Sequence, residues 1–340
     1  MPTKKRNIFT KILIWRYKYI SERQFILVLS ILVGFLAGLG TVLLKYLTLF
    51  IQSVLEGGFI KNYYYSLYFI FPIIGVWLVY LIKKNFIKKE IGHGISTTLY
   101  SISKRSGIIE RYKMFASLIV APITVGFGGS VGLQGPAVST GAALGSNVAS
   151  LFHMNAKTRM LLIGCATAGA MSSMFKAPVA AIVFAIEIFS LDLVFASLVP
   201  LLLASIAAVI TSYFFRGTDV LFSFELLDAW RVKDIVFYVL LGLATGIASV
   251  YFSKMYFLIT RFFSRFSNAY IKIGIAAIAI GFMLYLFPPL YGEGYGLINN
   301  LLNGNTEVAL SGIQYQIDFN NIWMVIVILL IIAVFKAIAM

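Results

Sequence analysis

The chain is organised around long runs of apolar residues that are separated by short polar or basic stretches. Each run is close to the ~20 residues that a helix needs to cross a bilayer, and the runs are Phe25–Leu44, Tyr68–Ile82, Ile235–Phe252, Ile273–Phe287 and Ile322–Met340. The pattern predicts an all-α, multi-pass membrane protein with spans over residues 25–54, 66–82, 235–253, 273–290 and 322–340. Tyr112–Phe215 is also apolar, but Gly, Pro and Ser interrupt it repeatedly. It does not divide into full-length spans, so we look for function there.

Composition supports this class and excludes several others. Hydrophobic residues make up 60% of the 340 residues and charged residues 12%, and the mean hydropathy is +0.91, which is not a soluble composition. The single cysteine, Cys165, excludes an internal disulfide and is expected to be a small apolar residue in a helix. The two histidines, His93 and His153, are too few for a metal centre. We therefore predict neither a metal site nor a cofactor.

The net charge of +15 is explained by topology rather than by a nucleic-acid partner. Basic residues gather in residues 1–24, 83–89, 104–113 and 254–272, which the positive-inside rule places in the cytoplasm. The intervening segments 56–62, 216–234 and 292–321 are near neutral, mixed or acidic, and are expected outside. The prediction is a cytoplasmic N-terminus, a basic amphipathic segment over 1–24, a first transmembrane repeat over 25–215, an external linker over 216–234 and a second, incomplete repeat over 235–340.

Two similar turns indicate that the repeats are inverted. Gly92-His93-Gly94-Ile95 and Gly292-Glu293-Gly294-Tyr295 are both Gly-x-Gly turns that open a short helix. The charge argument places the first turn in the cytoplasm and the second outside. Inverted repeats with broken, re-entrant helices are typical of transporters that bind substrate near the bilayer midplane.

The segment from Gly126 to Pro136 is the most informative stretch of the chain, because it combines glycines with an apolar setting. Its composition predicts non-helical backbone, which is tolerated at membrane depth only where it lines a cavity or is buried in protein. Glycines before a helix start leave N–H groups that can face an anion, with partial rather than full positive charge. The alternative is that small residues only permit close helix packing. We favour packing for 141–145 and 164–170, and an anion site for Gly132–Pro136, since Gln134 is polar there.

At these residues the sequence resembles the CLC family of chloride channels and chloride/proton antiporters. The resemblance lies in Gly92–Ser96, Gly132–Pro136 and Lys176-Ala177-Pro178-Val179, and it extends through Val179–Glu187 and Gly292–Leu302. It implies the CLC fold, a homodimer in a bilayer with a separate anion pathway in each subunit, and no cofactor. The anion-binding residues that it implies are His93, Gly94, Ile95, Gly132, Leu133, Gln134 and Gly135.

The departures from the family pattern bear on mechanism. His93 stands where the family usually has a serine that touches the central halide, and Ser96 stands where it has a proline. Gln134 occupies the position of the gating glutamate and has neither charge nor a titratable proton. Ile188 occupies the internal proton-relay position, beside Glu187, for which a structural role is the alternative. The resemblance therefore implies a protein without an evident proton route.

We expect passive conduction of chloride or a similar anion across a bacterial inner membrane. A proton antiporter that uses another carrier is one alternative, and a non-conducting membrane protein with an assembly or regulatory role is another. The sequence stops before the family's later Gly-x-Phe-x-Pro turn, and we expect it to be a fragment of a longer protein. No enzyme is predicted, because Ser96 or Ser130 with His93 is the sole candidate catalytic pair and lacks an orienting acid.

Overall fold

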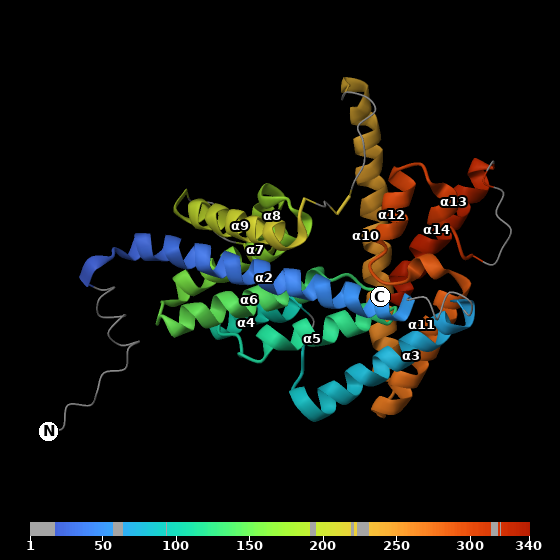
Figure 1. The fold of residues 1–340 in the computed structure, drawn as a ribbon, viewed down its shortest axis with the longest axis horizontal. Coiled ribbons are helices and arrows are strands. Elements are labelled where there is room, and N and C mark those ends of the chain that lie inside the picture. Colours follow the sequence, from blue (N-terminus) through green and yellow to red (C-terminus); the bar gives the residue numbers. More distant parts are fainter. Residues whose placement is uncertain are drawn as a thin grey trace. The chain divides into compact units, whose positions relative to one another are not determined.

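A computed structural model describes residues 18–56, 64–92, 94–190, 195–218, 221–222, 231–313, 319 and 321–340. Every regular element in these ranges is a helix (Figure 1). The predicted amphipathic segment before residue 18 and most of the predicted external linker lie outside the described residues. The all-α prediction is confirmed.

Six helices are long and apolar enough to cross a membrane. They are α2 (Glu22–Glu56), α3 (Tyr64–Ile82), α9 (Phe195–Arg216), α10 (Ile235–Ser264), α11 (Ala269–Leu286) and α14 (Ile322–Ala339). Five of them, all except α9, overlap the five spans predicted from the apolar runs. Helix α11 ends at Leu286, before the predicted end of its span at residue 290, and α10 continues to Ser264, beyond the predicted end at residue 253. The basic side chains Lys254 and Arg261 are accommodated on its exposed surface without ending the helix.

Shorter or less apolar elements form the rest of the described chain. They are η1, a π-helix (Lys83–Ile87), α4 (Ile95–Arg105), α5 (Lys113–Gly126), α6 (Gln134–Leu151), α7 (Ala156–Phe175), α8 (Pro178–Phe189), α12 (Tyr295–Leu302) and α13 (Thr306–Ala309), together with two single 3-10 turns, η2 (Val232–Asp234) and η3 (Pro288–Leu290). Helices α4 and α12 follow the two Gly-x-Gly turns, with Gly94 and Gly294 as N-cap residues. The prediction of short helices behind both turns is confirmed.

The chain forms two compact units, residues 1–47, 89–121 and 133–221 in the first and residues 48–88, 122–132 and 222–340 in the second. These units interleave along the chain, whereas the repeats predicted over 25–215 and 235–340 are consecutive segments. The repeat boundaries therefore stay a prediction.

Small residues build the core of the first unit. A Cβ added at Gly145 of α6 would lie 2.3 Å from the carbonyl oxygen of Leu162, and one at Gly141 would lie 2.7 Å from that of Ala166. Helices α6 and α7 thus touch backbone to backbone, as small residues allow in membranes. A Cβ added at Gly169 of α7 would lie 3.2 Å from the Cα of Gly34 in α2. The packing role predicted for 141–145 and 164–170 agrees with these contacts, and Cys165 is buried among them.

The second unit packs α3 against α11 and α14 against the turn that follows α11. A Cβ added at Gly281 of α11 would lie 2.5 Å from the carbonyl oxygen of Phe69 in α3. The buried side chains of Leu284, Leu290, Leu310 and Ile332 form a second apolar core. This core fixes the segment 287–294, which contains the second Gly-x-Gly turn.

Candidate functional site

The first Gly-x-Gly turn has a backbone that only glycine adopts easily. Gly92 has φ +80° and Gly94 has φ +53° with ψ −109°, values that L side chains rarely take. The carbonyl oxygen of Gly94 accepts hydrogen bonds from the backbone N–H of Thr98 at 3.3 Å and from its hydroxyl at 3.1 Å. These bonds start α4 directly after the turn. His93 lies outside the described residues.

This turn lies against the first turn of α6. A Cβ added at Gly94 would be 3.1 Å from the carbonyl oxygen of Gly135 and 3.3 Å from its Cα. Two of the predicted anion-binding segments, around Gly94–Ile95 and around Gln134–Gly135, are therefore neighbours within the first unit. On its own Cβ side Gly135 has no other heavy atom within 4 Å. The neighbourhood thus combines a tight backbone contact with adjoining open space.

The non-helical stretch is shorter than the sequence predicted. Gly126 is the last residue of α5, and α6 already begins at Gln134, with the fully buried Leu133 as its N-cap residue. Leu133 accepts the N–H of Ala137 at 2.9 Å, and Pro136 fits in the first turn because no donor is needed there. The prediction of non-helical backbone was wrong for Gln134 and Gly135, whereas Pro136 lies in the first turn of the helix, as expected. The glycine-rich run that favours irregular backbone ends at Gly132, so a helix can begin at Gln134.

The glycine-rich residues before Leu133 belong to the second unit and contact its Gly-x-Gly turn. The Ser130 hydroxyl donates a hydrogen bond of 2.6 Å to the carbonyl oxygen of Leu290, and the Tyr291 hydroxyl donates to that of Gly126. Gly128, with φ +94°, packs on the Tyr291 ring, where an added Cβ would lie 2.8 Å from a ring carbon. Side chains thereby join the glycine-rich segment before Leu133 to Leu290 and Tyr291, which precede the second Gly-x-Gly turn.

Lys336 of α14 is a member of this site that the sequence analysis missed. Its ammonium donates to the carbonyl oxygen of Gly292 at 2.7 Å and to that of Leu290 at 3.3 Å. The carbonyl of Leu290 therefore accepts from both Lys336 and Ser130. The available signal was a single lysine in an otherwise apolar span, since an ionisable residue at such a place marks a functional or structural site.

The start and the end of α8 meet different surroundings. Lys176 caps α7 with φ +54°, and its ammonium donates to the carbonyl oxygen of Gly217 at 2.6 Å and lies 4.7 Å from the centre of the Tyr213 ring. Near the other end, Ile188 packs against the apolar core of the first unit, together with Ile95. Glu187 is exposed. Of these two neighbouring residues, the isoleucine thus packs against the core and the glutamate is exposed.

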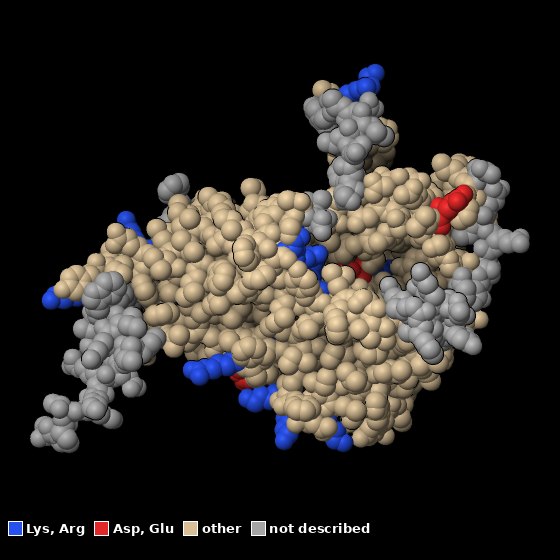
Figure 2. Space-filling view, viewed as in Figure 1, with Lys and Arg blue, Asp and Glu red and all other residues tan. Residues whose placement is uncertain are grey.

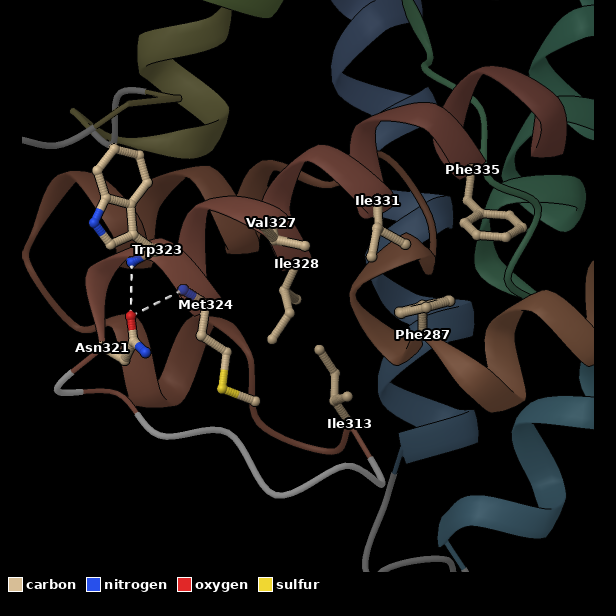
Figure 3. A pocket seen from close by; sticks show the side chains of 9 residues that line it. All are labelled: Phe287, Ile313, Asn321, Trp323, Met324, Val327, Ile328, Ile331 and Phe335. Carbon is tan, nitrogen blue, oxygen red and sulfur yellow. Dashed lines mark hydrogen bonds between the residues drawn. The ribbon is translucent and has the colours of Figure 1, made fainter.

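A pocket of about 860 Å³ in the second unit does not suit an anion. Met324, Ile328 and Ile331 of α14 point into it toward Ile313 and Phe287 (Figure 3). The polar side chain on its wall, Asn321, caps α14 by accepting from the N–H groups of residues 323 and 324. An apolar lining supplies no hydrogen bonds to replace the hydration of an anion, so the candidate site stays with the glycine turns.

Comparisons with known proteins agree with this geometry. The family model "Voltage gated chloride channel" matches residues 74–340. A putative chloride channel protein ClcB-like from Ralstonia nicotianae is 25% identical over 221 residues, 62% of this chain and 50% of that protein. An H(+)/Cl(-) exchange transporter ClcA from Vibrio campbellii is 28% identical over 195 residues, 55% of this chain and 42% of that protein. The chain thus matches half or less of the length of these relatives.

Solved structures share the fold. A slow cyanobacterial Cl-/H+ antiporter superposes with a TM-score of 0.72 at 18% identity, over 94% of this chain and 74% of that one. A CLC-type fluoride/proton antiporter gives 0.71 at 22% identity, over 92% and 75%. The architecture of broken helices predicted from the sequence is the one that these structures have. With a family model that covers most of its length, the chain belongs to the voltage-gated chloride channel family.

Proposed function

We propose that this protein conducts chloride or a similar small anion passively across a bacterial inner membrane, without proton coupling. Two positions together carry the proposal, namely Gln134 at the first position of α6 and Ile188, which packs against the apolar core of the first unit. Neither side chain can carry a proton. Family membership supports anion transport, and the finer statements that follow are ours.

The anion would be held by backbone rather than by a full charge. The positive end of α6 begins at Gln134, and the first N–H groups of a helix have no acceptor within that helix. With the turn of Gly94 and Ile95 beside Gly135, several N–H groups can approach one ion. Partial charges bind an anion weakly enough to release it, which conduction requires. We assign anion binding to His93, Gly94, Ile95, Gly132, Leu133, Gln134 and Gly135.

The proposed absence of proton coupling rests on two positions. Glutamine has the shape of glutamate but no titratable proton, so Gln134 cannot alternate between charged and neutral states. Ile188 packs against core side chains, while the neighbouring Glu187 is exposed. A relay through position 188 would require an acid inside that core. We further propose a homodimer, a cytoplasmic N-terminus and the two transmembrane repeats over 25–215 and 235–340.

The test is flux in liposomes that contain the purified protein. With chloride and pH gradients imposed separately, the reversal potential should follow the chloride gradient and ignore the pH gradient. Proton uptake driven by a chloride gradient would contradict the uncoupled mechanism. Absence of any anion flux from a folded, reconstituted protein would contradict anion conduction itself.

A gate variant sharpens the test. Gln134→Glu should make chloride flux rise as the pH falls toward the ordinary glutamate pKa of about 4.3, because the carboxylate competes with the anion and its protonated form does not. Gln24→Glu, which adds the same group at the exposed start of α2, is the matched control and should leave the pH profile unchanged.

A proton-coupled antiporter is the second candidate, and the relatives favour it. One sequence relative is named an H(+)/Cl(-) exchange transporter, and one structural neighbour is a fluoride/proton antiporter. If this protein is an antiporter, protons must move with a fixed ratio to anions in the wild-type chain. Repeating the flux assay with fluoride in place of chloride tests the anion at the same time.

A further inference from the structure

The second unit has one end where all charges have the same sign. Here α3 passes into the π-helix η1, which carries Lys83 and Lys84, and Lys88 follows it; α10 ends near Arg265 and α11 begins four residues later. The segments 64–88 and 235–292 hold no aspartate or glutamate. On the face drawn in Figure 2, basic side chains lie near the end of α3, and a small acidic patch is visible beside them. Because these segments have no carboxylate to balance the positive charges, the charges attract anions from outside the chain.

Aromatic side chains surround one of these lysines. The Lys84 ammonium lies 3.4 Å from the Tyr270 hydroxyl and 5.9 Å from the centre of the Tyr80 ring. The rings of Trp77, Tyr80 and Tyr270 have centres 5.3 to 6.1 Å apart. Trp and Tyr favour the level of lipid headgroups, because their rings are apolar and their polar atoms need partners. The cluster is therefore suited to an ammonium at the level of lipid headgroups.

An exposed apolar surface continues from the cluster along both helices. On α3, Ile74, Leu78 and Leu81 recur at helical spacing and are exposed, and on α11 Ile278 and Phe282 are exposed by more than half. This surface can receive acyl chains, while the lysines meet the headgroup. The arrangement has both parts that a phospholipid needs.

Two basic residues of the first unit share a carboxylate. Glu110 lies 3.7 Å from the ammonium of Lys89 and 3.8 Å from the guanidinium of Arg105. A carboxylate between two cations reduces the attraction for a further anion. Lys104, exposed on α4 beside this group, therefore provides a matched position without the aromatic cluster.

We propose that the end of α3 and the start of α11 form a binding site for an anionic phospholipid. Lys84 and the Tyr270 hydroxyl would hold the headgroup phosphate, Lys83 and Lys88 would add charge, and the acyl chains would lie along α3. A π-helix is rare and is often found at functional sites, and η1 is where the two lysines emerge.

The test uses the quenching of Trp77 fluorescence by lipids brominated on their acyl chains. The full chain is placed in nanodiscs with increasing mole fractions of brominated phosphatidylglycerol or brominated phosphatidylcholine, and the signal of Trp77 is obtained by subtracting that of Trp77→Phe. Phosphatidylglycerol should quench at lower mole fraction. Lys84→Gln combined with Tyr270→Phe should raise the mole fraction for half-quenching about fivefold, the factor for the ~1 kcal/mol per basic residue expected at a charged surface, and Lys104→Gln should leave it unchanged.

Three results would overturn the proposal. Equal quenching by both lipids would mean that no headgroup is selected. Competition by millimolar inorganic phosphate would mean that the site takes free phosphate rather than lipid. An unchanged mole fraction for half-quenching in the Lys84→Gln, Tyr270→Phe chain would show that these two residues do not bind the headgroup. If that chain elutes as an aggregate, the Lys83→Gln, Lys88→Gln chain is used instead. The mole fraction for half-quenching should then rise about fivefold for each positive charge removed.

Discussion

The two Gly-x-Gly turns share a backbone pattern but are held in different ways. The turn of Gly94 rests on backbone, since its Cα approaches the carbonyl group of Gly135 at the start of α6. The turn of Gly292 is held by side chains, because Lys336 donates to its carbonyl oxygen and to that of Leu290, and Ser130 donates to the latter as well. The first turn therefore requires a residue without a Cβ. The second requires two hydrogen-bond donors, the Lys336 ammonium and the Ser130 hydroxyl.

This difference suggests that the two turns tolerate change differently. At Gly94 an added Cβ would be in tight contact with the Gly135 carbonyl group, and φ is positive, so the first turn should be sensitive to every substitution of Gly94. A side-chain support can be weakened in steps, because each donor contributes separately to the same carbonyl groups. The expected losses below follow that order.

Gly94→Ala should have the largest effect. Alanine at φ +53° is strained, and its Cβ would lie 3.1 Å from the Gly135 oxygen, so we expect a loss of ~3 kcal/mol in unfolding free energy together with loss of anion flux. Thermal unfolding in detergent and flux in liposomes measure the two effects. Gly296→Ala in α12, where an added Cβ meets nothing within 4 Å, should be neutral or slightly stabilising. Equal losses in both variants would contradict a role for the backbone contact.

Lys336→Met should have an intermediate effect. The change leaves the Gly292 carbonyl without its 2.7 Å donor, which we expect to cost ~2 kcal/mol because a charged hydrogen bond is lost in a half-buried place. The unfolding temperature should fall, and Lys336→Arg should recover part of the loss. Lys254→Met on the exposed surface of α10 is the control for loss of one positive charge. A Lys336→Met chain as stable as that control would refute the support assigned to the second turn.

Ser130→Ala should have the smallest effect. Leu290 loses its 2.6 Å donor but keeps Lys336 at 3.3 Å, so ~1 kcal/mol is expected. Since both donors share one carbonyl oxygen, the losses of the double variant with Lys336→Met should not add. A double-mutant cycle by thermal unfolding gives this coupling. Strict additivity would show that the two donors act independently and that the shared carbonyl is unimportant.

Local features of the site were predictable from the sequence, and its long-range supports were not. The positions of both turns and of the helices behind them follow from glycines at fixed spacing, because only glycine takes the required backbone angles. The start of α6 was predicted at Pro136, two residues too late, since composition alone does not show that the first turn of the helix includes Gln134 and Gly135. Lys336 was missed because it acts on a carbonyl group 44 residues away in the chain.

The sequence by itself determined the membrane class, the family and the apolar spans. It also determined that the side chains at positions 134 and 188, a glutamine and an isoleucine, cannot carry a proton. These depend on composition, periodicity and residue type, which need no knowledge of neighbours. Tertiary structure alone decided that Gly94 meets Gly135, that Ile188 faces the core while Glu187 is exposed, and that Lys336 and Ser130 share one carbonyl oxygen. Such contacts join segments far apart in the chain, and their geometry is set by helix packing, which no local pattern records.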